Sequence, residues 1–114
     1  MSDTIITGPV GDVRISGLMS AQASTPGDAV LFQLVRNPGG SETVVGPSPI
    51  VISDSTLGLA FCSITYQDSP GAGTHTYGIR ATNDTNISHT VSVPNVNNAS
   101  LSMFSSRWAL TIKY

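Results

Sequence analysis

Glycine and proline interrupt this chain roughly every 8 to 12 residues, so the segments between them are too short for ordinary helices. No long window repeats apolar residues at the helical spacing. Many short β-prone segments at this spacing are typical of a β-sandwich or barrel. We expect strands over residues 4–7, 13–19, 29–36, 41–45, 50–53, 57–67, 75–81, 88–93, 99–105 and 108–114. The sequence therefore predicts an all-β fold, a two-sheet sandwich of the jelly-roll kind.

The length of the chain and the glycines and proline of residues 8–11 indicate its domain organisation. A chain of 114 residues forms one domain with a single core. Residues 1–7 are β-prone, and the sequence Gly-Pro-Val-Gly separates them from the rest. We therefore predict a connector and linker over residues 1–11 and a jelly-roll domain over residues 12–114.

Two interpretations of residues 1–7 stay open. The segment is either an ordinary first strand or a connector that adds to the next subunit and buries Ile5 and Ile6 there. In the second case the hinge would be formed by Gly8, Pro9 and Gly11, since glycine is conformationally free and proline removes a donor from any continuing strand ladder.

Charged residues make up 11% of the chain, against about 25% in a typical domain. Serine, threonine and asparagine replace them, and such a surface costs less to desolvate against a neighbouring protein. The five basic residues are scattered, which argues against nucleic-acid binding, and the apolar runs are too short to span a membrane. The composition favours protein–protein contact.

No catalytic or metal-binding pattern stands out. His75 and His89 fall on separate expected strands, and the interpretation we favour is structural. The seven acids occur singly, mostly in turns, where an aspartate accepts local main-chain hydrogen bonds. Cys62 lies in an apolar strand and is expected to be a buried, inert thiol, with an intermolecular disulfide as the alternative. We predict no enzyme activity, no metal and no cofactor.

Two sets of apolar residues are assigned from their positions in the expected strands. The core is expected to contain Phe32, Leu34, Phe61, Ile64, Ile79 and Val91. A three-fold interface is expected to contain Leu101, Met103, Phe104 and Trp108, because they exceed what one face of a single sandwich needs.

One stretch resembles a known family. Residues 63–77, with Asp-Ser-Pro-Gly-Ala-Gly-Thr-His-Thr-Tyr at their end, and residues 97–102 resemble the C-terminal heads of Bacillus-type collagen-like exosporium proteins. Those heads are similar to the jelly rolls of tumour necrosis factor and complement. The resemblance implies a homotrimer. This chain has no Gly-x-y stalk, so a short connector, similar to that of endospore appendage fibres, is the expected link between subunits.

The expected function is therefore that of a structural subunit of a self-assembling spore-surface fibre, whose trimers stack through their connectors. Its partners would be copies of itself and a spore-coat anchor or tip protein. The N-terminus has no signal-peptide pattern, so an extracellular place would follow from cell lysis. The alternative is a phage tail-fibre or capsid-decoration head on a virion, with a role in binding the host surface. A sugar-binding module is a third class, for which exposed aromatic residues beside acids or amides would be expected.

Overall fold

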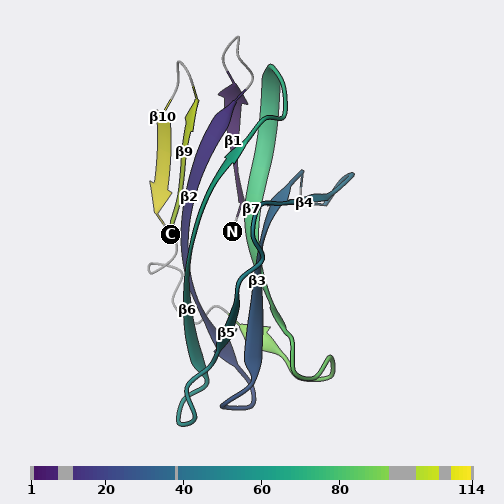
Figure 1. Cartoon of the computed structure of the whole chain (residues 1–114), viewed down its shortest axis with the longest axis vertical. Helices are drawn as coiled ribbons and strands as arrows, with labels where there is room; N and C mark the ends of the chain where they lie inside the picture. Colours follow the sequence, from purple (N-terminus) through teal and green to yellow (C-terminus); the bar gives the residue numbers. More distant parts are fainter. Residues whose placement is uncertain (1, 8–11, 38, 93–99, 106–108, 114) are drawn as a thin grey trace.

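The protein is a sandwich of two antiparallel β-sheets packed face to face (Figure 1). The computed structural model describes residues 2–7, 12–37, 39–92, 100–105 and 109–113, and for the first and the last two of these ranges it describes the backbone. Every regular element in the described ranges is a strand. The predicted two-sheet, all-β fold is confirmed.

The first sheet, here sheet A, has the order β1-β7-β3-β4, with β5 also paired to β3. Its strands are β1 (Ser2–Thr7), β3 (Ala29–Arg36), β4 (Thr43–Val45), β5 (Ile50–Ile52) and β7 (Gly73–Asn83). The second sheet, sheet B, has the order β10-β9-β2-β6, with β8 also paired to β2. Its strands are β2 (Val13–Ala23), β6 (Leu59–Asp68), β8 (Val91–Ser92), β9 (Ser100–Ser105) and β10 (Ala109–Lys113).

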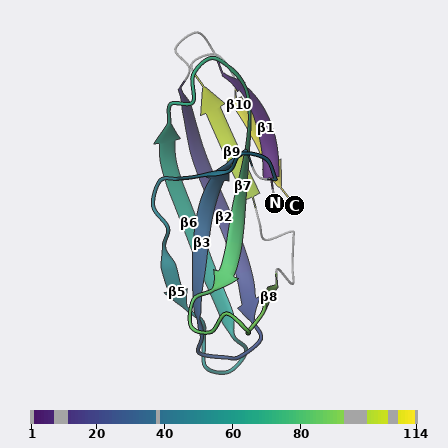
Figure 2. The same ribbon diagram turned by 90° about the vertical axis from the view of Figure 1, so that its right-hand side faces the viewer.

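The chain crosses from one sheet to the other at most of its connections. Only the stretches from β3 to β5 and from β8 to β10 stay within one sheet. The edge strands β1 and β10 lie on one side of the sandwich, whereas β5 and β6 lie on the other (Figures 1 and 2). The molecule is elongated along its strands, with extents of 47 × 25 × 19 Å.

The core follows from alternation along the strands, in which every second side chain points to the opposite sheet. In β2 the inward residues are buried and residues such as Arg14, Ser16 and Leu18 are exposed. The largest fully buried side chains are Tyr77, Phe32, Ile15, Leu34, Val13, Val30 and Val35. β3 lies between β7 and the pair β4 and β5, as expected for a central strand.

The expected core is right except at one position. Phe32, Leu34, Ile64 and Ile79 are buried, and Val91 is partly buried against the same cluster. Phe61 is 63% exposed, so its assignment to the core was wrong. Ala60, Cys62 and Ile64 take the inward positions of β6, and alternation therefore places Phe61 on the outer face. The buried thiol predicted for Cys62 is confirmed.

Two tight turns require glycine. Gly46 and Gly58 have φ angles of 69° and 72°, in the left-handed region that other residues rarely adopt. A Cβ atom at Gly46 would lie 2.6 Å from the ring of Tyr66, and one at Gly58 would lie 2.5 Å from the carbonyl oxygen of Ala23. A larger residue at either position would therefore have both a strained backbone conformation and a steric clash.

A pair of phenylalanine substitutions tests the strand alternation. Phe32→Ala should lower the free energy of unfolding by about 3–5 kcal/mol, because it leaves a cavity between the sheets. Phe61→Ala should change it by about 0.5 kcal/mol, as is usual for an exposed side chain. Urea unfolding of both variants measures the difference, and equal losses would contradict the placement of Phe61 outside the core.

Candidate functional site

The predicted docking residues lie in an edge strand of the molecule's own sheet. β1 pairs antiparallel with β7, with Ile5 opposite His75 and Ile6 opposite Thr74. In the described part of the chain, no second strand pairs with β1. In this structure residues 2–7 thus form an ordinary first strand. The hinge residues Gly8, Pro9 and Gly11 lie outside the described residues, so the boundary between connector and domain stays a prediction.

The predicted trimer-interface residues are grouped by the strand pairing. Leu101, Met103 and Phe104 belong to β9, where they are in register with Gly17, Ile15 and Arg14 of β2. β9 lies between β2 and β10 in sheet B. Trp108 lies outside the described residues. The three-fold interface therefore stays a prediction.

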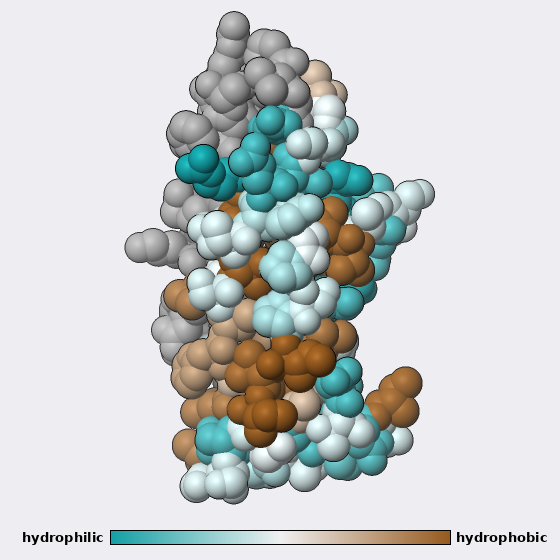
Figure 3. All heavy atoms as spheres, in the orientation of Figure 1, coloured by the Kyte–Doolittle hydropathy of each residue, from teal (hydrophilic) through white to brown (hydrophobic). Residues whose placement is uncertain are grey.

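Apolar side chains are exposed on the outer faces of both sheets. On sheet B, Leu18 is 48% exposed and Phe61 63%. They are diagonal neighbours, since Leu18 is opposite Ser63, two residues from Phe61. On sheet A, Ile50 and Ile52 are 55% and 68% exposed. Figure 3 shows apolar side chains gathered over the lower half of the molecule, on the side of β5 and β6.

The edge strand β6 adds a second feature to this side. It runs for ten residues and pairs with β2, and no other strand of the described ranges pairs with it. Its one charged residue, Asp68, is buried. Long edge strands usually carry charges, prolines or bulges that prevent pairing with other chains. The described residues of β6 include none of the usual protective charges or prolines.

Leu57 is exposed in the loop between β5 and β6, and hydrogen bonds to Asp54 hold this loop in place. The carboxylate of Asp54 accepts main-chain hydrogen bonds from Thr56 at 2.9 Å, Leu57 at 2.6 Å and Leu59 at 2.8 Å. These bonds, that from Leu57 first, hold the pKa of Asp54 below its ordinary value. The turn is thereby fixed with Leu57 pointing outward, consistent with the prediction that turn aspartates accept local hydrogen bonds.

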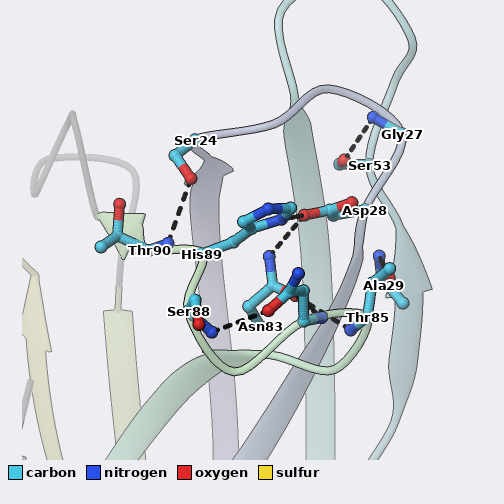
Figure 4. A network of polar contacts seen from close by, with 11 residues as sticks. Ser24, Gly27, Asp28, Ala29, Ser53, Asn83, Thr85, Ser88, His89 and Thr90 are labelled. Carbon is cyan, nitrogen blue, oxygen red and sulfur yellow. Dashed lines mark hydrogen bonds and ion pairs between the residues drawn. The ribbon is translucent and has the colours of Figure 1, made fainter.

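A buried carboxylate ties the lower loops together (Figure 4). Asp28, in the loop before β3, accepts hydrogen bonds from the Asn83 amide at 2.8 Å and from Nδ1 of His89 at 2.6 Å. The bond from Asn83, followed by that from His89, lowers the pKa of Asp28. The neighbouring main chain is joined as well, since the amide of Thr90 donates to the hydroxyl of Ser24.

The contact with Asp28 fixes the position of the His89 imidazole. An Asp–His pair acts in catalysis when the second imidazole nitrogen contacts a nucleophile. Among the described residues, no hydroxyl is hydrogen-bonded to Nε2 of His89. His89 lies in the loop between β7 and β8 and not in a strand, because β8 begins only at Val91. His75 is also held locally, through Nε2 and the carbonyl of Gly71 at 2.9 Å.

A second buried carboxylate joins the two sheets at the other end of β3. Asp68 ends β6, and its Oδ2 accepts from Arg36 at 2.8 Å and from the hydroxyl of Tyr77 at 2.6 Å. Burial, followed by the hydrogen bond to Asp68, raises the pKa of Tyr77. Arg36 and Tyr77 are opposite each other on β3 and β7. The contact therefore links sheet A to sheet B.

No group of three or more His, Cys, Asp or Glu side chains in the described residues is placed to hold a metal ion. The described part of the chain also has no helix long and apolar enough to cross a bilayer.

The two loop carboxylates predict how stability depends on pH. Asp28 and Asp54 have lowered pKa values in the folded protein, so the folded state binds protons less readily than the unfolded chain. Their contribution to the free energy of unfolding is present above the ordinary pKa of 3.8. It is lost as the pH falls through the lower pKa values of the folded protein. The urea concentration at the midpoint of unfolding should therefore decrease as the pH is lowered below 3.8.

The variant Asp54→Asn should be less stable than the wild type at neutral pH, because an amide nitrogen would face main-chain donors. It should also lose less stability in acid. Asp84→Asn, which changes an exposed carboxylate in a loop, is the control. An unchanged acid dependence in Asp54→Asn, measured by urea unfolding at several pH values, would rule out this role.

Comparison with protein-family models gives no match, and neither curated proteins nor solved structures give one. Function is therefore inferred from the described residues and from the resemblance in the sequence.

Proposed function

We propose that this chain is a structural subunit that assembles with copies of itself into a fibre. The observation that carries the proposal is the exposure of large apolar side chains on the outer faces of both sheets, in a chain with 11% charged residues. Leu18 and Phe61 form one such group on sheet B, and Ile50 and Ile52 form another on sheet A. Apolar groups on the outer faces of two different sheets would allow one copy to contact more than one neighbour.

Burial of these exposed side chains between copies would contribute measurably to the free energy of association. Full burial of a leucine, isoleucine or phenylalanine side chain stabilises by about 1.5–3 kcal/mol, and these side chains have roughly half of that still to gain. The surrounding serine and threonine residues, such as Ser16, Ser63 and Thr65, cost less to desolvate than charged side chains would. Each contact between copies would be weak alone, whereas several contacts in one assembly would act together.

The order of the strands supports a jelly-roll subunit. Each sheet has four strand positions, because β4 and β5 share one side of β3 and β8 and β9 share one side of β2. Eight positions in two antiparallel sheets, with crossings between sheets at most connections, are what a jelly roll needs. In the homotrimer we propose, β9 and the residues after it would approach the three-fold axis.

The edge position of β1 supports stacking through the N-terminus. Among the described strands β1 pairs with β7 alone. This pairing, with residues 73–78, is an antiparallel ladder between main chains. The β1 segment of a neighbouring copy would make the same pairs, and such exchange of an identical element costs little. The connector, with its hinge at Gly8, Pro9 and Gly11, would then join trimers end to end. The spore surface, with an anchor or tip protein, is the place that the resemblance implies.

Removal of the apolar group on sheet B tests the assembly. The double variant Leu18→Ser/Phe61→Ser should keep its fold and assemble only at concentrations at least tenfold higher, since each lost contact of about 1.4 kcal/mol changes the association constant tenfold. Light scattering and negative-stain microscopy measure assembly.

Ile87→Ser makes the same kind of change in the loop between β7 and β8 and is the control. Unchanged assembly of the double variant would contradict the proposed surface. Discrete trimers of the wild type would point to the phage-head alternative, and monomers would end the proposal.

Deletion of residues 1–7 tests the connector. The truncated chain should fold, because β7 keeps β3 as its partner and the core residues whose side chains are described lie in other strands. It should form particles that do not stack. Circular dichroism and negative-stain microscopy report the two properties, and fibres of normal length from the truncated chain would exclude stacking through the N-terminus.

A further inference from the structure

A polar groove lies beside the upper part of β7. The chain leaves β3 after Arg36 and enters the turn that leads to β4, whereas β7 continues past this point to Gly73 (Figure 1). The pairing of β3 with β7 ends at Arg36 and Tyr77, and in the described ranges no other strand pairs with Thr74 and Thr76 on this side of β7. The groove at this position has a volume of about 370 Å³, within the range of small-molecule sites.

The turn residue Asn37 shapes the groove. Its φ angle is 61°, in the left-handed region, which asparagine tolerates better than most residues. Its main-chain N–H donates to the carbonyl of Thr76 at 2.7 Å. Its side-chain amide lies in the groove wall and reaches the Ser41 carbonyl at the long distance of 3.5 Å. Most of the bonding capacity of this amide is therefore open to a ligand.

The main chain of β7 contributes as well. In an antiparallel strand the N–H and C=O groups of one residue point to the same side, and this side alternates along the chain. Because the Thr76 carbonyl points to Asn37, the main-chain groups of Thr74, two residues away, also point to this side. The groove thus has a peptide donor and acceptor from Thr74 in addition to its side chains.

The charges near the groove are paired. Arg36 lines the groove, and its guanidinium is bound to Asp68 at 2.8 Å. Arg80 and Glu42 pair with each other at 3.0 Å. The other lining side chains are uncharged hydroxyls and an amide, with the imidazole of His75 held by Gly71. Among the residues that line the groove, a small anion would therefore find no unpaired arginine or lysine.

We propose that this groove binds a neutral saccharide unit. Sugar hydroxyls both donate and accept hydrogen bonds, as do the amide of Asn37, the peptide group of Thr74 and the hydroxyls of Ser41 and Thr43. An extended peptide fits less well, since it needs a series of main-chain partners and Asn37 already takes the Thr76 carbonyl. No aromatic ring lines the groove other than the His75 imidazole, so the expected dissociation constant is about millimolar.

Saturation-transfer NMR on the full chain tests this inference, because the method observes the ligand and works with large assemblies. The probes are glucose, galactose and N-acetylglucosamine, with sialic acid and inorganic sulfate as charged comparisons. At least one neutral sugar should receive saturation from the protein with a saturable dependence on its concentration. The inference does not depend on self-assembly, and monomeric protein should bind equally.

Two variants locate the site. Asn37→Gly keeps the left-handed turn and removes the amide, and Thr43→Val removes one of the two hydroxyls named above at constant size. Asn37→Gly should weaken binding about tenfold, which corresponds to about 1.4 kcal/mol. Gln22→Ala, at the opposite end of the molecule, is the control and should bind as the wild type does. The inference is overturned if only the charged probes bind, if no neutral sugar binds, or if both groove variants bind with wild-type affinity.

Discussion

Buried carboxylates tie the two sheets together at both ends of the apolar core. Along β3 the core residues Val30, Phe32 and Leu34 follow one another between Asp28 at the start and Arg36 at the end. Arg36 reaches Asp68 of sheet B, and Asp28 holds the loop that leads into β8 of sheet B. A buried charge is costly unless it is hydrogen-bonded, and each carboxylate has two side-chain donors. These contacts therefore favour one alignment of the sheets over others.

The strand alternation of the sequence was enough to predict much of the fold. The bounds expected for the strand over residues 29–36 are those of β3, and each of the other expected strands overlaps an observed one. The apolar neighbours of Phe61 in residues 57–67 favour a core position, whereas strict alternation favours an outward one. Counting every second residue from Ile64 would have placed Phe61 outside.

Contacts between distant residues could not be predicted in the same way. Asp28 and His89 are 61 residues apart, and nothing near either residue in the sequence indicates the other. The groove at Asn37 depends on β7 being longer than β3, and a single strand pattern does not show relative lengths across a sheet. Asn37 forms part of the groove wall because its main chain is hydrogen-bonded to β7, which is a contact between residues far apart in the sequence.

The edges of the two sheets connect these features with the proposed assembly. A sandwich that stays monomeric protects its edge strands with charge, proline or a bulge, and β6 shows no charge other than the buried Asp68. Among the described strands only β2 pairs with β6, and β6 also carries the exposed side chain of Phe61, so one neighbouring copy could cover both the free edge and this side chain. The salt bridge of Asp68 turns the single charge of β6 inward, toward Arg36 and Tyr77. The interaction that joins the sheets thus also leaves this edge uncharged, which would favour the proposed contact between copies.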